Sequence, residues 1–345
     1  MTAVAVLSLA LGIGANTAIF SLVNSLLLRP LPVPRPDRLV GLSTGIEPVE
    51  RSNFSYATFD EIRRHADAFD GALAFSNCCG QSMVTVGGER WAADRFFVSG
   101  DFFATLGMTP AAGRFFTPAD DVAGGGAGGA VAVISDRLWR ERFGGRAGIA
   151  GTAIVVERAP VTIVGVAPRG FVGMEIGRNI DLILPAALEP MVLASTPFDD
   201  GTAWLNVMLR MKPGVSREAA EASLRAAQPQ IRAGSARGET RSGFLEAPFT
   251  LTPAGGGMSS LRTRFERPLV ALLIVVAVVL LVACANVANL QLARAAARRH
   301  ELSVRIALGA SRLQLAQQLF AESVLLAAAG TVAGLAFAQW ASRAI

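Results

Sequence analysis

Residue types that commonly perform catalysis are scarce in this sequence. The two histidines are His65 and His300, and the hydropathy pattern places them on opposite sides of a membrane. A Ser-His-Asp site in the larger domain would have to use His65, and no local motif favours such a site. The sequence has no H-E-x-x-H motif, no paired C-x-x-C motif and no acidic metal-binding loop. We therefore expect a protein that is not an enzyme and that binds no metal or cofactor directly.

Two glycine-rich stretches suggest phosphate-binding loops but lack the residues that complete them. The glycines of residues 124–129 are not followed by Lys-Ser/Thr, and no G-K-S/T sequence occurs anywhere in the chain. Gly12-Ile13-Gly14 lacks the third glycine of a dinucleotide loop, because Thr17 takes its place. We interpret residues 124–129 as a flexible surface loop, and the chain cannot carry a P-loop ATPase of its own.

The composition is that of a membrane protein. Of the 345 residues, 52% are hydrophobic and only 17% are charged, against roughly a quarter in an average soluble domain. The formal net charge is +5, but the arginines are scattered beside aspartates and glutamates, so we expect no nucleic-acid partner. The three cysteines, Cys78, Cys79 and Cys284, indicate no disulfide framework.

Apolar residues concentrate in three segments, which we predict to be transmembrane helices at residues 1–29, 268–293 and 313–341. A helix rises about 1.5 Å per residue, so each segment can cross a hydrocarbon core of about 30 Å. A signal peptide is the alternative for the first segment, but such peptides begin with basic residues and have a shorter apolar core. No basic residue precedes this run, which favours a helix retained in the lipid bilayer.

Small residues recur at helical spacing in the first and third segments. Ala10, Gly14 and Ala18 lie four positions apart, and Gly330 with Gly334 forms a G-x-x-x-G pair. This spacing lets a neighbouring helix approach closely in lipid. We therefore predict that Gly14, Ala18, Gly330 and Gly334 are helix-packing residues.

The charge of the loops predicts the orientation in the membrane. Residues 294–312 hold five arginines and one glutamate, and short arginine-rich loops stay in the cytoplasm. Residues 35–262 then lie outside the cytoplasm, although arginines flank them at both ends. Long domains cross the membrane largely regardless of such charges, so the short loop decides the orientation.

Residues 35–262 contain both strand and helix patterns, and we expect an α+β domain. Residues 205–211 alternate apolar and polar side chains, which predicts a strand with one face buried. Ser216 can cap a following helix through about residue 227, with Pro229 as its end or a kink. A second strand is predicted at residues 130–134, then a helix capped by Ser135 and closed by Gly144. Apolar runs on either side of residues 157–160 predict a hairpin.

Several motifs resemble those of MacB-like and FtsX-like permeases of ABC transporters. The most specific is residues 298–311, Arg-Arg-His-Glu-Leu-Ser-Val-Arg-Ile-Ala-Leu-Gly-Ala-Ser, which resembles the family's coupling segment. Residues 11–20 and 28–32 resemble the acidobacterial-type duplicated permeases within this group. Further motifs resemble the family's periplasmic core, at residues 98–103, 106–107, 113–114, 137–139, 143–145 and 164–168.

The resemblance implies a permease subunit of an ABC-type transporter or export system in the bacterial inner membrane. Each unit of the family has four spans, with a large periplasmic domain after the first. A separate or fused nucleotide-binding subunit hydrolyses ATP, and two permease units act as a dimer. Closure of the ATPase is transmitted mechanically to the periplasmic domains, and substrates are usually expelled from the periplasm.

The resemblance also predicts where the ATPase subunit binds. A short helix with arginines and an apolar side would dock in a groove of the ATPase. The predicted ATPase-coupling residues are Arg298, Arg299, Glu301, Leu302, Arg305, Ile306, Leu308 and Gly309. The alternative is that these arginines only set the topology.

The chain departs from the family pattern in two ways. The fourth span is missing after the third apolar segment, and no basic region precedes the first. We therefore expect a fragment of one half of a duplicated permease. The alternative function is a membrane-anchored extracytoplasmic sensor or interaction protein without transport activity. A neighbouring gene for an ATPase with Walker motifs would favour the permease.

Overall fold

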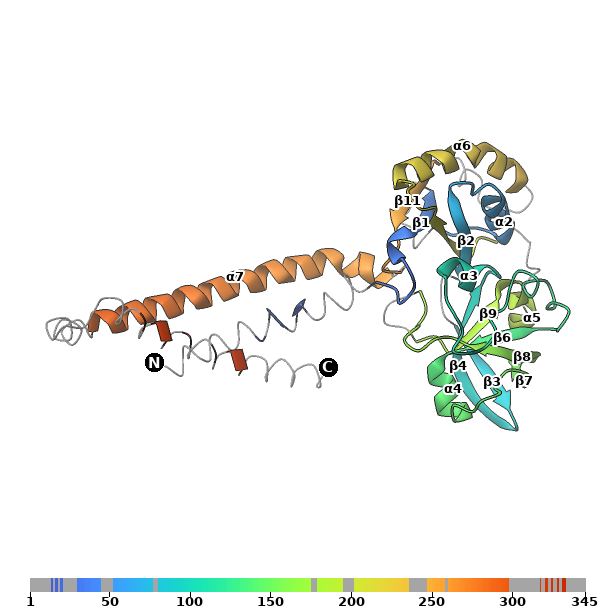
Figure 1. Cartoon of the computed structure of the whole chain (residues 1–345), viewed down its shortest axis with the longest axis horizontal. Helices are drawn as coiled ribbons and strands as arrows, with labels where there is room; N and C mark the ends of the chain where they lie inside the picture. The colour runs from blue at the N-terminus through green and yellow to red at the C-terminus, as the bar shows by residue number, and fades with distance from the viewer. Residues whose placement is uncertain are drawn as a thin grey trace. The chain divides into compact units, whose positions relative to one another are not determined.

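A computed structural model describes residues 30–44, 52–76, 80–174, 179–194, 202–235, 247–257 and 260–297, with single helical positions in 14–20 and 317–332. The chain forms two units. One is Pro30–Ser260, and the other combines Met1–Arg29 with Leu261–Ile345. The first unit contains two lobes (Figure 1).

The first lobe, which we call the split lobe, contains four antiparallel strands in the order β11-β1-β10-β2. One helix connects β1 to β2 and another connects β10 to β11, so two βαβ units interleave in the ferredoxin-like arrangement. Its elements in chain order are β1 (Leu39–Thr44), α2 (Tyr56–Arg64), β2 (Phe69–Ser76), β10 (Leu205–Met211), α6 (Arg217–Ser235) and β11 (Phe249–Pro253).

Both faces of this sheet are covered. On one face, Phe59 and Ile62 of α2 pack with apolar strand residues, and Ser55 begins the helix by accepting a hydrogen bond from the Thr58 N–H. The opposite face packs against α3 (Phe102–Leu106). Along α6 the buried residues recur every three or four positions, as expected for a helix with one covered face: Ala220, Leu224, Gln228, Ile231 and Ser235.

Two predictions in the split lobe are corrected by the structure. Strand β10 lies inside the sheet and is buried on both faces, so Asn206 and Arg210 are only 2% and 8% exposed. The alternating pattern predicts a solvent face there, but α3 covers it. Pro229 does not end α6, which continues to Ser235 because residues beyond the proline remain buried against the lobe.

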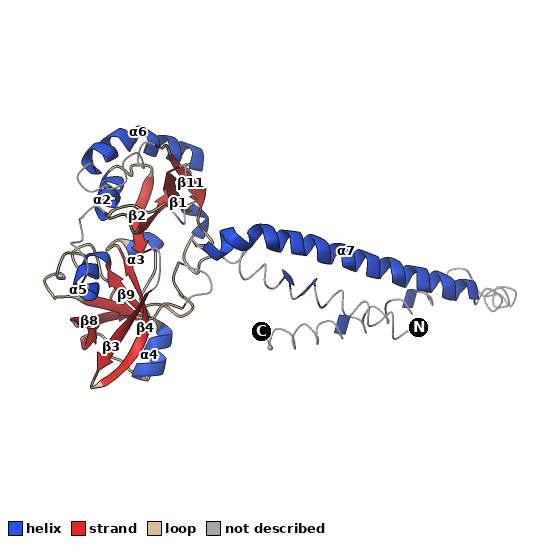
Figure 2. Cartoon of the chain, turned by 180° about the vertical axis from the view of Figure 1, so that it is seen from behind, coloured by secondary structure: helices blue, strands red, loops and turns tan. Residues whose placement is uncertain are grey.

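The second lobe, which we call the barrel lobe, is inserted between β2 and β10 (Figure 2). Six of its strands pair in a closed ring. Strand β4 pairs with β3, then β7, β8, β6 and β9 follow, and β9 pairs back with β4. The further elements between β2 and β10 are β3 (Gly80–Val86), β4 (Glu89–Val98), β5 (Ala112–Gly113), β6 (Val131–Ile134), α4 (Asp136–Phe143), β7 (Thr152–Val156), β8 (Ala159–Val166), β9 (Leu182–Pro185), η4 (Ala186–Leu188) and α5 (Glu189–Leu193).

Local signals in the barrel lobe predict its elements well. Strand β6 lies where the sequence predicts it. Helix α4 begins at Ser135, whose hydroxyl caps it, and ends at Gly144, which adopts the left-handed conformation at φ 64°. The predicted hairpin is β7–β8, with Glu157-Arg158 as its turn. Pro160 lies inside β8 rather than in the turn.

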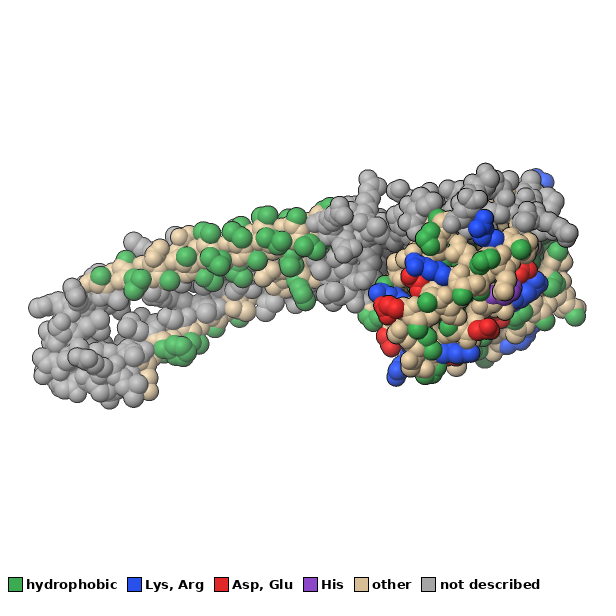
Figure 3. All heavy atoms as spheres, turned by 90° about the horizontal axis from the view of Figure 1, so that it is seen from above, with side chains coloured by type: hydrophobic (Ala, Val, Ile, Leu, Met, Phe, Trp, Pro, Cys, Tyr) green, Lys and Arg blue, Asp and Glu red, His purple; other side chains and the backbone are tan. Residues whose placement is uncertain are grey.

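Helix α7 (Ser260–Ala297) is continuous over 38 residues. In the part of the chain that the structure describes, it alone is long and apolar enough to cross a membrane, over Pro268–Asn286. Exposed apolar side chains at successive positions around it include Ile274, Val275, Val278 and Leu281, and hydrophobic groups cover the face seen in Figure 3. A helix that is apolar on all sides is typical of a membrane span or a deeply buried core helix.

The closing strand of the barrel lobe provides a test of its core. Leu184 on β9 is fully buried, so Leu184→Ala should lower the free energy of unfolding by about 2–5 kcal/mol. The measurement is urea unfolding of the full chain in detergent, followed by tryptophan fluorescence. Val155→Ala on the outer side of β7 is the control, with an expected change below about 0.5 kcal/mol. Equal unfolding midpoints for the two variants would contradict the assigned core.

Candidate functional site: the linker junction

Two linkers join the larger unit to its apolar flanks, and they lie side by side. The N-terminal linker is residues 30–38, and the C-terminal linker is residues 254–257. The Leu31 N–H donates to the Gly255 carbonyl at 2.8 Å, and β1 pairs with β11 directly beyond. A Cβ at Gly255 would lie 2.5 Å from the Pro36 carbonyl oxygen, so this contact requires glycine. The chain therefore enters and leaves the unit at one place, which we call the linker junction.

A buried arginine anchors the N-terminal linker. Arg210 of β10 donates hydrogen bonds to four backbone carbonyls. Two belong to the linker, Pro34 at 3.0 Å and Arg35 at 3.2 Å. The other two end α3, Thr105 and Leu106, the latter at 3.1 Å. Carbonyls at the C-terminal end of a helix carry partial negative charge, so they stabilise a cation there.

Arg38 fastens the end of the same linker to the sheet. Its Nε donates to the Met211 carbonyl at 2.7 Å, and its guanidinium forms an ion pair with Asp70 of β2. Burial lowers the pKa of Arg210, and the neighbouring Arg38 lowers it further. Because arginine nevertheless stays charged, the surrounding carbonyls and Asp70 must compensate two cations in a small volume. The junction is therefore held by charge as well as by backbone hydrogen bonds.

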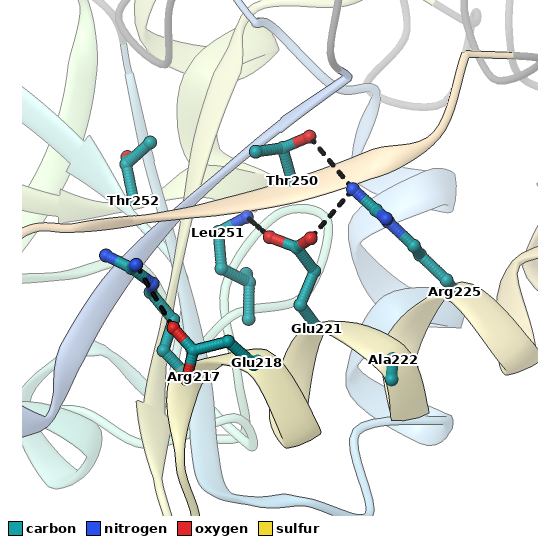
Figure 4. A pocket seen from close by; sticks show the side chains of 8 residues that line it. All are labelled: Arg217, Glu218, Glu221, Ala222, Arg225, Thr250, Leu251 and Thr252. Atoms are coloured by element: carbon teal, nitrogen blue, oxygen red, sulfur yellow. Dashed lines mark hydrogen bonds and ion pairs between the residues drawn. The ribbon is translucent and has the colours of Figure 1, made fainter.

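Helix α6 holds the edge strand β11, which leads into the C-terminal linker. Glu221 accepts a hydrogen bond from the Leu251 N–H at 2.8 Å (Figure 4). Arg225 donates to the Phe249 carbonyl at 2.6 Å, and Gln228 accepts from the Phe249 N–H at 3.2 Å. Side chains of α6 thus make hydrogen bonds that a further strand would otherwise make. The β11 edge is covered, which discourages pairing with another chain.

A cleft of about 630 Å³ lies between α6 and β11. Its charged side chains pair with one another, Arg217 with Glu218 at 3.2 Å and Arg225 with Glu221 at 2.7 Å (Figure 4). No charge in the cleft lining is left over for a ligand. We therefore interpret the cleft as part of the contact that holds β11.

A buried carboxylate connects the two lobes. Asp121 of the barrel lobe accepts a hydrogen bond from the Tyr56 hydroxyl of α2 at 2.9 Å. It also accepts from the N–H groups of Gly100 and Ala187, both at 2.8 Å. Burial raises the pKa of Asp121, and these three donors oppose that rise. A carboxylate bonded from both lobes resists their separation, because breaking the contact leaves buried polar groups unsatisfied.

Most sequence-predicted site residues cannot be compared with this geometry. Gly14 is described and is buried at a helical position. His65 Nδ1 lies 3.0 Å from the Glu61 carbonyl at the end of α2, and the described residues hold no group of three or more His, Cys, Asp or Glu that could bind a metal ion. Outside the described residues lie Arg298, Arg299, Glu301, Leu302, Arg305, Ile306, Leu308 and Gly309, with Ala18, Gly330 and Gly334.

Reasoning from the sequence misses the residues that anchor the site, among them Arg38, Arg210 and Asp121. An arginine within a strand of otherwise apolar or amide side chains is the one signal that points to Arg210. Nothing near Asp121 in the sequence marks it, because its partners Tyr56 and Ala187 lie far away along the chain.

Comparison with known proteins gives matches along most of the chain. The family model for the MacB-like periplasmic core domain matches residues 2–227, and the model for the FtsX-like permease C-terminal region matches residues 273–345. The macrolide export ATP-binding/permease protein MacB of Escherichia coli (strain K12) is 28% identical over 247 residues, which are 71% of this chain and 34% of that protein. The chain spans about a third of the length of the curated relatives it matches.

Two solved structures are similar in part. The periplasmic region of MacB from Actinobacillus actinomycetemcomitans has a TM-score of 0.45 and 14% identity, over 66% of this chain and 92% of that one. A domain of a permease protein from Porphyromonas gingivalis has a TM-score of 0.46 and 20% identity, over 68% of this chain and 98% of that one.

The anchoring role of Arg210 can be tested by Arg210→Met, which keeps the apolar stem but removes all donors. Four carbonyls then lose a charged partner, so the free energy of unfolding should fall by about 2–4 kcal/mol. The measurement is urea unfolding of the full chain in detergent. Arg217→Met removes an exposed arginine of α6 and should change stability by less than about 0.5 kcal/mol. If both variants unfold alike, Arg210 does not anchor the linker.

Proposed function

Because the chain belongs to the MacB-like and FtsX-like family of ABC transporter permeases, we propose that it transmits the ATP-driven motion of a partner ATPase to its periplasmic core domain. Members of this family are inner-membrane proteins with a periplasmic domain, and they work with ABC ATPases. The Escherichia coli relative is named as an ATP-binding and permease protein in one. For this chain, which has no G-K-S/T sequence, ATP is hydrolysed by a separate subunit or by a fused domain.

The observation that carries the proposal is the continuity of α7. Its 38 residues extend for about 57 Å at 1.5 Å per residue, well beyond a hydrocarbon core of about 30 Å. One end follows β11 after a few residues, and the other end, Ala297, directly precedes the predicted coupling residue Arg298. An unbroken helix keeps its length when one end is displaced, so a movement at the cytoplasmic end would reach the C-terminal linker.

The linker junction supports the second half of this path. The C-terminal linker is hydrogen-bonded to the N-terminal linker, and Arg210 bonds the N-terminal linker to α3. Displacement of α7 would therefore pull on both linkers together and on the sheet between them. In this proposal the periplasmic core domain responds as one body.

The proposed membrane architecture follows the family. In this proposal residues 1–29, 268–293 and 313–341 span the membrane, and residues 35–262 lie outside the cytoplasm. Residues 298–309 form the contact with the ATPase on the cytoplasmic side. A second permease unit, as a separate copy or a duplicated half, completes the transporter in the bacterial inner membrane. The positive-inside rule supports this orientation, because residues 294–312 are rich in arginine.

The coupling segment is tested by the double substitution Arg305→Glu with Leu302→Ala in the full-length permease. Reversing one charge and removing one apolar contact should abolish binding of the cognate ATPase subunit. Stimulation of ATP hydrolysis in reconstituted vesicles should then fall to the rate of the ATPase alone. The measurement is phosphate release, with co-purification as the binding assay.

The matched control is Arg217→Glu, which reverses an exposed charge on α6. It should leave both binding and stimulation unchanged. Unchanged stimulation by a correctly inserted double variant would reject the coupling assignment and favour a membrane-anchored sensor or interaction protein.

A further inference from the structure

Two aromatic rings in contact, with an arginine stacked on each, lie where α4 meets β4 in the barrel lobe. The Arg142 guanidinium lies 5.2 Å from the centre of the Trp91 ring. Trp91 contacts Phe143 edge to face at 6.4 Å, and Arg146 lies 5.8 Å from the Phe143 ring centre. Both arginines are exposed, and both rings are partly exposed. We call Arg142, Trp91, Phe143 and Arg146 the stacked row.

The charges around α4 are not balanced. Residues 136–146 hold four arginines and two carboxylates, and Asp181 adds a third carboxylate through its ion pair with Arg137 at 2.6 Å. Arg137 pairs with Glu141 at 3.1 Å, and Arg140 pairs with Asp136 at 2.9 Å. The two arginines of the stacked row have no carboxylate partner among the residues that the structure describes. The unpaired positive charge is therefore concentrated on the stacked row.

Stacking prepares these arginines for an anionic partner. A guanidinium that lies over a ring loses side-chain freedom before binding, while its N–H groups stay available for a bidentate bond to a carboxylate. Arg146 uses one N–H on the Thr152 hydroxyl at 3.2 Å, which fixes it further. Tryptophan, phenylalanine and arginine are also the residue types enriched where protein surfaces bind one another.

We propose that the stacked row is a docking surface for an acidic segment of another protein. Carboxylates of that segment bind Arg142 and Arg146, and its apolar side chains pack on the exposed parts of Trp91 and Phe143. A membrane surface fits less well, because neither ring is exposed enough to insert into lipid. The proposal does not depend on the transport function, since it concerns the barrel lobe alone.

The test measures binding of a fluorescein-labelled synthetic peptide that alternates glutamate with leucine, by fluorescence anisotropy, to the full chain in detergent. Arg142→Glu with Arg146→Glu should weaken binding by more than about tenfold. Arg142→Lys with Arg146→Lys keeps the charge but removes the planar fork, and it should also weaken binding clearly. Lys212→Glu with Arg217→Glu makes the same charge change on the split lobe and should leave binding within about twofold. Circular dichroism checks that each variant is folded.

Three results would overturn the proposal. The first is equal loss in the glutamate variant and the split-lobe control, which indicates general attraction to a basic protein. The second is unchanged binding in the lysine variant, because stacking and the arginine fork would then play no role in binding. This result would reject the proposal even if the glutamate variant failed to fold. The third is binding of the wild-type chain to phosphatidylglycerol vesicles, with loss in the lysine variant, but not to the peptide.

Discussion

The larger unit depends on one buried cation. Arg210 brings a positive charge into the interior of the split lobe, where removal from water is costly unless strong partners surround it. The carbonyls of the N-terminal linker and of the α3 end are those partners. The arginine can bind both only if β10 lies within the sheet and α3 lies across it. Its position therefore fixes the linker, the sheet and the first helix of the inserted segment relative to one another.

The unit also has to protect its strand edges. The barrel lobe does so by closure, because β9 pairs with β4 and completes the ring. The split lobe cannot close, so α6 side chains bond the outer edge of β11, and β2 meets β4 through the pair Phe75 and Val98. The last of these pairings makes the hydrogen-bonded sheet continuous between the lobes. Asp121 adds a second connection at the level of side chains.

Sequence signals predict what is decided locally. Ser135 and Gly144 bound α4, because a cap and a left-handed glycine act within one helix. The β7–β8 hairpin follows for the same reason. Long-range contacts are different. Arg210 contacts residues 104 and 105 positions away in the chain, because most of the inserted lobe lies between α3 and β10 in the sequence. An alternating pattern cannot reveal that α3 covers the second face, so Arg210 falls on a predicted solvent face. The ATPase-coupling residues rest on resemblance alone, since no property of residues 298–309 by itself distinguishes a docking helix from a basic loop.

The same contacts constrain how motion could pass through the chain under the proposed function. The junction is charged, hydrogen-bonded and close-packed, and Gly255 leaves no room beside Pro36. Packed interiors change between discrete arrangements rather than deforming smoothly. A small displacement of the C-terminal linker would therefore carry the junction with it instead of stretching the bonds inside it. Because Asp121 and the β2–β4 pair join the lobes, the barrel lobe would follow the split lobe. Any hinge for such a movement then belongs outside the junction and outside the contacts that join the lobes.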